Sequence, residues 1–239
     1  KLNIAGSNGI YTSSGAVDLN VKEISIESTN VAISARKDST IDCDKLSVES
    51  VEYGAISIAP GKLTINGSEN SELTIVSPKG DAVQGYAGVT IRGGKLDITG
   101  NYGIYTANGT LELTVKEISV ESEHSAIFGN ESVTIDCDTA TVVAGTIGLN
   151  TAGSIIIKNG VFDIQSTDTT ASEAYNSALY FEDAFTYPTG ATVVAATEPN
   201  GTFVPYVEAD NATYDHVKIT APTIYDIWVG GIGMVDGDY

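Results

Sequence analysis

The chain repeats itself at a short, regular interval, and this repeat constrains its fold more than any other feature. Residues 1–44 and 95–138 match without a gap at 24 of 44 positions. Within that shift of 94 residues, a small residue followed by an aliphatic one recurs, which predicts a unit of about 22–23 residues. The aliphatic members of these pairs are Ile10, Ile33, Ile56, Val83, Ile104, Ile127, Leu149 and Leu179.

Each unit holds three short segments in which apolar and polar residues alternate, as they do in strands. The predicted inward pairs of the second segment are Val17/Leu19, Ile41/Cys43, Leu63/Ile65, Val89/Ile91, Leu111/Leu113, Ile135/Cys137 and Ile155/Ile157. Those of the third segment are Ile24/Ile26, Leu46/Val48, Leu73/Ile75, Leu96/Ile98, Ile118/Val120, Ala140/Val142 and Phe162/Ile164. A single unit cannot bury its inner face, so successive units must stack.

We therefore predict an all-β fold, a right-handed parallel β-helix of seven to eight coils with three strands in each coil. A leucine-rich repeat has a similar period, but its LxxLxLxxN pattern is missing and no segment has a helical pattern. The insertions at 66–80 and 165–176 are expected to leave the coils as loops.

The expected organisation has three parts. The β-helix covers 1–185, and the proline-rich segment 186–222 is expected to form capping strands and loops. Residues 223–239 are interpreted as a linker or the start of a further module, next to neighbouring modules of a longer chain. The chain begins at Lys1 within an alternating segment and shows no signal-peptide pattern, so we expect it to be a part of that longer protein.

The charge of the chain limits its partners. It has 31 acidic and 12 basic residues and a formal charge of −19, which argues against nucleic acid and anionic membrane surfaces. No stretch approaches the roughly 20 apolar residues of a membrane-spanning helix, so no membrane insertion is expected. The 42% of hydrophobic residues is enough for a folded core.

The two cysteines occur in the same context, TIDCD, four coils apart. At about 4.8 Å between neighbouring strands they would be roughly 19 Å apart, too far for a disulfide. Cys43 and Cys137 are therefore predicted to be buried, unpaired core residues.

Acidic residues are predicted to gather at two outward positions four coils apart. Asp18 is expected beside Asp42 with Asp44 one pleat along, and Glu112 beside Asp136 with Asp138 one pleat along. Like charges on adjacent strands repel each other unless a cation lies between them, and calcium prefers several oxygen ligands at close range. These six residues are the candidate calcium ligands, and the alternative is a solvated acidic surface.

One outward column is partly aromatic. It contains Tyr11, Ser34, Ser57, Gln84, Tyr105, Phe128, Asn150 and Tyr180. Tyr105 and Phe128 are expected on adjacent coils, and exposed aromatic faces suit the apolar faces of sugar rings. Tyr11, Tyr105 and Phe128 are thus the candidate carbohydrate-binding residues, and the alternative is that a neighbouring loop or chain covers them. His124 and His216 are isolated and are interpreted as ordinary surface or capping residues.

Catalysis is not expected. No GxSxG, HExxH or phosphate-binding glycine loop occurs. Arg92 is the only arginine on a predicted strand, its column neighbours are Asn66 and Thr114, and no acidic partner is expected in its column. The sequence therefore offers no catalytic residues, although many β-helix proteins cleave polysaccharides.

Residues 80–114 resemble the repeats of secreted, right-handed parallel β-helix proteins of anaerobic Gram-positive bacteria, a carbohydrate-binding and adhesin-like family. The matching residues are Asp81-Ala82-Val83, Val89-Thr90-Ile91, Gly93-Gly94 and Leu96-Asp97-Ile98. The resemblance covers roughly residues 1–180 and implies a shape like that of pectate lyases, calcium binding, and binding of plant polysaccharides, including acidic ones, without established catalysis. The family's repeated aspartate is present here only at Asp81.

The leading functional hypothesis is a non-catalytic, extracellular module of a secreted or surface-attached bacterial protein that binds a polysaccharide or surface glycan, with calcium assisting. The second hypothesis is a structural stalk or spacer. The third is a polysaccharide lyase.

Overall fold

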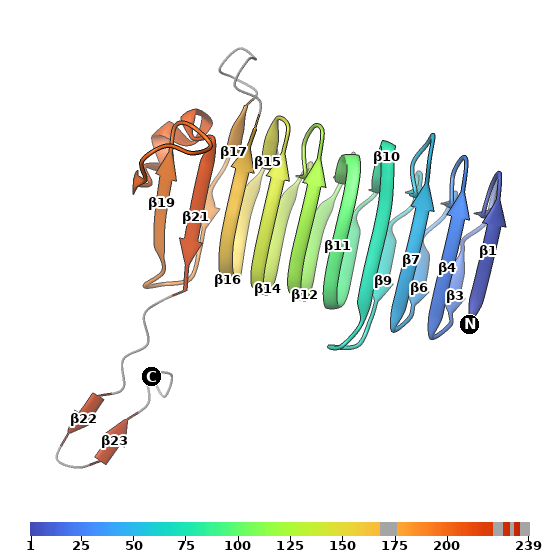
Figure 1. Ribbon diagram of the computed structural model, residues 1–239, viewed down its shortest axis with the longest axis horizontal. Coiled ribbons are helices and arrows are strands. Elements are labelled where there is room, and N and C mark those ends of the chain that lie inside the picture. Colours follow the sequence, from blue (N-terminus) through green and yellow to red (C-terminus); the bar gives the residue numbers. More distant parts are fainter. Residues whose placement is uncertain (168–175, 222–226, 230–231, 235–239) are drawn as a thin grey trace.

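The computed structural model describes residues 1–167 and 176–221, together with the backbone of 227–229 and 232–234. The chain forms a β-solenoid of about eight turns of stacked parallel strands, with 62% of residues in strands and 3% in helix (Figure 1). This confirms the all-β class and the stacked coils that the repeat predicts.

Each turn adds one strand to each of three faces. The longer strands bend at the corners and continue from one face onto the next, so one of these strands can belong to two or three faces. Face 1 contains β2 (Ile10–Tyr11), β5 (Ile33–Ala35), β8 (Ile56–Ile58), the ends of β10 (Glu72–Gly85) and β11 (Val89–Thr106), β13 (Ile127–Gly129), β15 (Ile147–Asn150) and β17 (Ser177–Tyr180). Face 2 contains β3 (Asp18–Asn20), β6 (Ser39–Asp42), β9 (Leu63–Asn66), the start of β11, the starts of β12 (Thr110–Ser122), β14 (Ser132–Ala144) and β16 (Ser154–Ser166), and β18 (Phe185–Thr186). Face 3 contains β1 (Leu2–Gly6), β4 (Glu23–Ser28), β7 (Lys45–Ser50), the start of β10, the middle of β11 and the ends of β12, β14 and β16.

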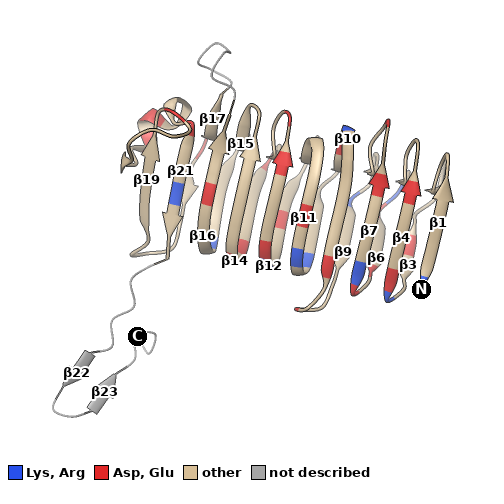
Figure 2. Ribbon diagram, viewed as in Figure 1, with Lys and Arg blue, Asp and Glu red and all other residues tan. Residues whose placement is uncertain are grey.

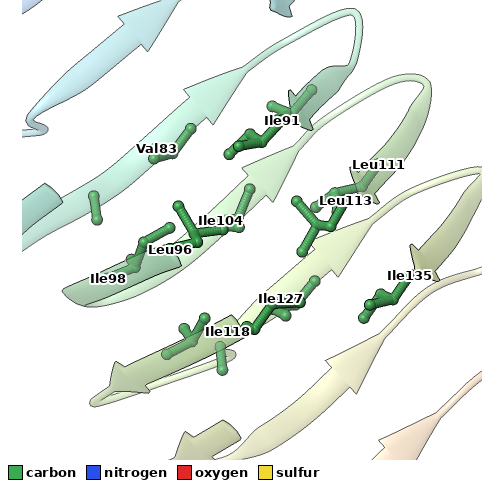
Figure 3. Packing of buried hydrophobic residues seen from close by; sticks show 14 of the residues in the cluster. Val83, Ile91, Leu96, Ile98, Ile104, Leu111, Leu113, Ile118, Ile127 and Ile135 are labelled. Carbon is green, nitrogen blue, oxygen red and sulfur yellow. The ribbon is translucent and has the colours of Figure 1, made fainter. Parts of the chain in front are cut away.

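Inward and outward side chains separate as the alternation predicts. Charged residues occur along the length of the solenoid (Figure 2), and no Lys, Arg, Asp or Glu is among the buried residues of the described chain. The predicted column of face 1 is confirmed, since Ile10 pairs with Ile33 and the register continues to Leu179. The predicted pairs of face 3 are confirmed in the same way, and side chains of successive turns meet in the core (Figure 3).

The register that the sequence predicts for face 2 is wrong by two residues at both cysteines. Leu19 pairs with Ile41, not with Cys43, and Leu113 pairs with Ile135, not with Cys137. Ser39 fills the inward position that an apolar residue was expected to hold. Its buried hydroxyl accepts a hydrogen bond from the Val17 amide at 3.0 Å and donates to a backbone carbonyl, so the polar group is satisfied.

One predicted loop is only partly a loop. Residues 67–71 leave the strands, but Asn66 ends β9 and residues 72–80 belong to β10, whose register shifts between Ser77 and Asp81. Most of the other insertion, at 165–176, lies outside the described residues, because the description stops at 167 and resumes at 176.

Antiparallel strands cover the last turn. These elements are β19 (Thr192–Ala196), β20 (Val204–Pro205), the 3-10 helix η1 (Glu208–Thr213) and β21 (His216–Thr220). Strand β21 pairs antiparallel with the end of β16 and with β19, so the open edge of face 3 is closed by hydrogen bonds. Beyond residue 221 the description includes only an antiparallel pair, β22 (Ile227–Val229) and β23 (Ile232–Met234).

A buried histidine holds this cap on the last turn. His216 is 4% exposed, and its Nε2 lies 2.6 Å from an oxygen of Asp163 on β16. Lys218 lies 3.3 Å from the other Asp163 oxygen, and Gln165 donates to Asp163 at 3.2 Å. Burial alone would raise the pKa of Asp163, but the hydrogen bonds from His216, Gln165 and Lys218 and the charge of His216 lower it below its ordinary value of 3.8.

The small residue before the aliphatic one is glycine in three of the eight pairs, and close backbone contact leaves no room for a side chain at those three positions. A Cβ added to Gly103 would lie 2.3 Å from the carbonyl oxygen of Ala126 on the next turn, and Gly9 and Gly148 face the same obstruction. We predict that Gly103→Ala lowers the free energy of unfolding by about 1–3 kcal/mol, as overpacked cores do, measured by urea denaturation. Gly6→Ala is the control, because its nearest atom would lie at 3.6 Å. Equal unfolding midpoints for the two variants would contradict this explanation.

The cap is predicted to lose stability in acid. Because the folded pKa of Asp163 is lowered, its contribution is complete above the unfolded value of about 3.9 and is lost as the pH falls through the folded value. Asp163→Asn should therefore lower the melting temperature at pH 7, and the difference from the parent protein should shrink below about pH 4. Asp97→Asn, three turns away in the same column, serves as the control. A difference that does not depend on pH would exclude the charge of Asp163 as its cause.

Candidate functional site

Two aromatic rings stack on each other on face 1. Tyr105 at the end of β11 and Phe128 on β13 pair across adjacent turns, as predicted, and their ring centroids lie 5.1 Å apart at 14°. Because both residues hold the same outward position in successive coils, the solenoid register itself brings the rings together. The stacking covers one face of each ring. The other face of the Phe128 ring is directed toward Asn150 on the next turn.

Two further rings extend this pair into a cluster. Tyr102 lies edge-on to Tyr105 with centroids 6.4 Å apart, and His124 lies 5.0 Å from Tyr102. Tyr102 and His124 sit at the corner where face 3 leads into face 1, outside the strict alternation, so the column pattern alone missed them. Tyr102 directly precedes the small–aliphatic pair of its unit, whereas Ser125 separates His124 from the pair of the next unit, so the two residues do not share a column of the repeat.

The predicted carbohydrate-binding residues do not all come together. Tyr11 is 63% exposed and belongs to the same column, but it lies four turns from Tyr105. At about 4.8 Å per turn, that separation is roughly 19 Å. Tyr105 and Phe128 thus form one candidate site, and Tyr11 is separate from it.

The aromatic cluster borders a hollow of about 300 Å³. Its described lining residues are Tyr102, Tyr105, His124, Ser125, Phe128, Thr146, Ile147 and Asn150. The hollow combines flat apolar rings with hydroxyl and amide groups, and no Lys, Arg, Asp or Glu occurs among those lining residues. Such a surface can bind a ligand that has both apolar faces and neutral hydrogen-bonding groups.

The predicted carboxylate clusters are not formed as the sequence suggested. Asp18 pairs with Thr40, not with Asp42, and its carboxylate accepts a hydrogen bond from the Thr40 amide at 3.1 Å. Glu112 pairs with Thr134, not with Asp136. Both predictions failed because the predicted register of face 2 was wrong by two residues. In the observed register, each TIDCD segment is shifted by two residues relative to the preceding turn.

The other four predicted calcium ligands, Asp42, Asp44, Asp136 and Asp138, line two hollows at the corner between faces 2 and 3. In the first hollow, Asp42 and Asp44 lie on either side of Cys43, and Asp42 accepts a hydrogen bond from Asn66 at 2.8 Å. The same hollow is lined by Asn20, Lys22 and Ser68. Within residues 1–167 and 176–221, no three His, Cys, Asp or Glu side chains are grouped as metal ligands would be.

The second hollow lies four turns later and contains basic as well as acidic residues. It is lined by Gly67, Glu69, Arg92, Gly93, Thr114, Val115, Lys116, Asp136, Cys137 and Asp138. The expected neighbours of Arg92, Asn66 and Thr114, are confirmed. The expectation that its column holds no acid is wrong, because Asp136 follows Thr114 in that column.

Both cysteines are unpaired and buried, as predicted. Burial, with a smaller contribution from the flanking aspartates, raises the pKa of Cys43 to about 11 and that of Cys137 to about 12. A thiol is a nucleophile or metal ligand only as its thiolate, so these cysteines act as core residues at neutral pH.

Among the described residues, no helix combines the length and hydrophobicity that crossing a membrane requires. Comparisons of the chain with protein-family models, with curated proteins and with solved structures found no match.

Proposed function

We propose that this solenoid binds carbohydrate, without cleaving it, at the hollow beside Tyr105 and Phe128. The observation that carries the proposal is the aromatic cluster on face 1, where partly exposed rings border a hollow with neutral polar groups. Pyranose rings have apolar C–H faces that pack against aromatic rings, and their hydroxyls hydrogen-bond to groups such as those of Ser125, Thr146 and Asn150.

The charge of the protein supports the same choice of ligand class. At −19 the chain repels nucleic acids and anionic membrane surfaces. An extracellular or cell-surface location is part of the proposal and rests on the resemblance of residues 80–114 to secreted β-helix proteins. Neighbouring modules of the same surface protein would then present the solenoid to its glycan.

Removing one ring should weaken binding more than it weakens the fold. We predict that Phe128→Ala raises the Kd for any glycan found on an array at least about tenfold, roughly 1.4 kcal/mol, measured by calorimetry. Tyr86→Ala is the matched control, because Tyr86 is 41% exposed and does not line this hollow. Melting temperatures of both variants separate lost binding from lost stacking.

The stalk hypothesis gives a different result in the same experiment. If the glycan array shows no ligand for the parent protein, the carbohydrate proposal fails and the solenoid is a spacer, whose stacked turns supply length and stiffness.

One observation favours a second candidate, a polysaccharide lyase. The second corner hollow places Arg92 and Lys116 near Asp136 and Asp138, which combines a basic group with carboxylates able to share a cation with an acidic sugar. Lys116 is already paired with Glu69 at 3.4 Å. Formation of unsaturated uronate products from polygalacturonate in the presence of calcium would favour this candidate over binding alone.

Calcium assistance stays part of the proposal, now with Asp42/Asp44 and Asp136/Asp138 as its ligands. Calcium that binds only the folded state raises stability by mass action, and it also relieves repulsion among the acidic residues. We predict that calcium raises the melting temperature more than sodium at equal ionic strength does. The double variant Asp42→Asn/Asp136→Asn should lose that difference, while Asp97→Asn should keep it. Equal effects of the two salts on the parent protein would identify these carboxylates as a solvated surface.

A further inference from the structure

A further hollow lies beside the aromatic one on the same edge of face 1. Its lining residues include Glu52, Tyr53, Ser57, Lys79, Asp81 and Gln84. Tyr53 is 60% exposed and so offers a further ring for apolar contact. Ser57 donates a hydrogen bond to Gln84 at 2.9 Å, and this contact orients the amide along the floor of the hollow.

The strand register places the two hollows side by side. Asp81 pairs with Tyr102, and Gln84 pairs with Tyr105, so the last residues of one hollow lie next to the first residues of the other. From Ser57 to Asn150 the combined surface crosses five successive turns. At about 4.8 Å per turn, the four spacings make roughly 19 Å, so the surface is long and runs parallel to the solenoid axis.

The charges of this surface select among ligands. Lys79 is the only Lys or Arg among the described residues that line the two hollows, and it is engaged by Glu52 at 2.7 Å. Asp81 is partly buried, and burial raises its pKa. A polyuronate would therefore meet carboxylates and no free cation, whereas the hydroxyls of a neutral sugar can donate to Asp81 and Gln84.

We propose that the two hollows form one groove for an extended, uncharged polysaccharide that lies along the solenoid axis, with Tyr53 and Asp81 as its second subsite. This inference rests on the proposed function, since it assigns a ligand class and a length to the same site. Successive sugar units would follow successive turns, with rings from Tyr53, Tyr102 and Phe128 supplying apolar contacts and side chains between them supplying hydrogen bonds.

A length series of oligosaccharides tests the inference. Neutral β-1,4-linked glucose, xylose and mannose oligosaccharides of two to eight units are titrated into the protein by calorimetry, alongside oligogalacturonates of the same lengths. For the best neutral series, we expect the affinity to rise at least about tenfold from the dimer to the hexamer and then to level off. Oligogalacturonates are expected to bind more weakly at every length.

Two variants locate the second subsite. Tyr53→Ala should weaken hexamer binding about tenfold and change dimer binding less than about twofold, because a dimer can occupy the aromatic hollow alone. The control Tyr86→Ala should change neither. Asp81→Asn, which keeps the shape and changes the acceptor, should also weaken the hexamer selectively.

The outcomes separate the two proposals. Neutral binding that stops rising at the dimer, or a hexamer affinity that Tyr53→Ala leaves unchanged, overturns the extended groove and leaves the carbohydrate site at Phe128 standing. Tighter binding of oligogalacturonates overturns the uncharged ligand class. Absence of binding in every series overturns the groove, and the proposed function fails with it only if the glycan array also shows no ligand.

Discussion

The structure depends on the hydrogen-bonded stacking of one turn on the next. Each turn is too thin to bury its own inner face, so its aliphatic side chains leave water only when the turns above and below supply the rest of the core. Parallel pairing then holds neighbouring turns in register, apart from local shifts such as the one between Ser77 and Asp81, and residues at the same position form columns. The close approach of Gly103 to the Ala126 carbonyl shows how little freedom the spacing leaves.

This regularity also gives the protein its surface. Because the turns repeat, residues at equivalent positions of successive turns form a row on the surface. Neighbouring turns therefore place similar groups side by side at a spacing of about 4.8 Å. The stack of Tyr105 on Phe128 is one result, and the adjacent position of the two hollows on face 1 is another. Rows of this kind suit polymeric ligands, whose chemistry repeats along their length as well.

Small register differences decide which chemistry is assembled. The observed register of face 2 differs from the predicted one by two residues, and this difference leaves the fold class unchanged. The observed register nevertheless separates Asp18 from Asp42 and places Asp136 in the column of Arg92. Because side chains alternate with a period of two, a shift of two residues keeps every inward residue inward. Apolar patterning therefore cannot detect this error, and the observed strand pairings, such as Ser39 with Leu63 and Val133 with Leu111, correct it.

The sequence by itself determined the all-β class, the stacking of the units, two of the three core registers and the burial of both cysteines. It could do so because hydrophobic alternation and an internal repeat are local signals that survive without knowledge of the neighbours. The tertiary structure decided which outward residues meet. Tyr102 and His124 lie at a corner, and the groove from Ser57 to Asn150 crosses five turns, so both depend on how the chain bends and on the pairing between turns, which alternation does not encode.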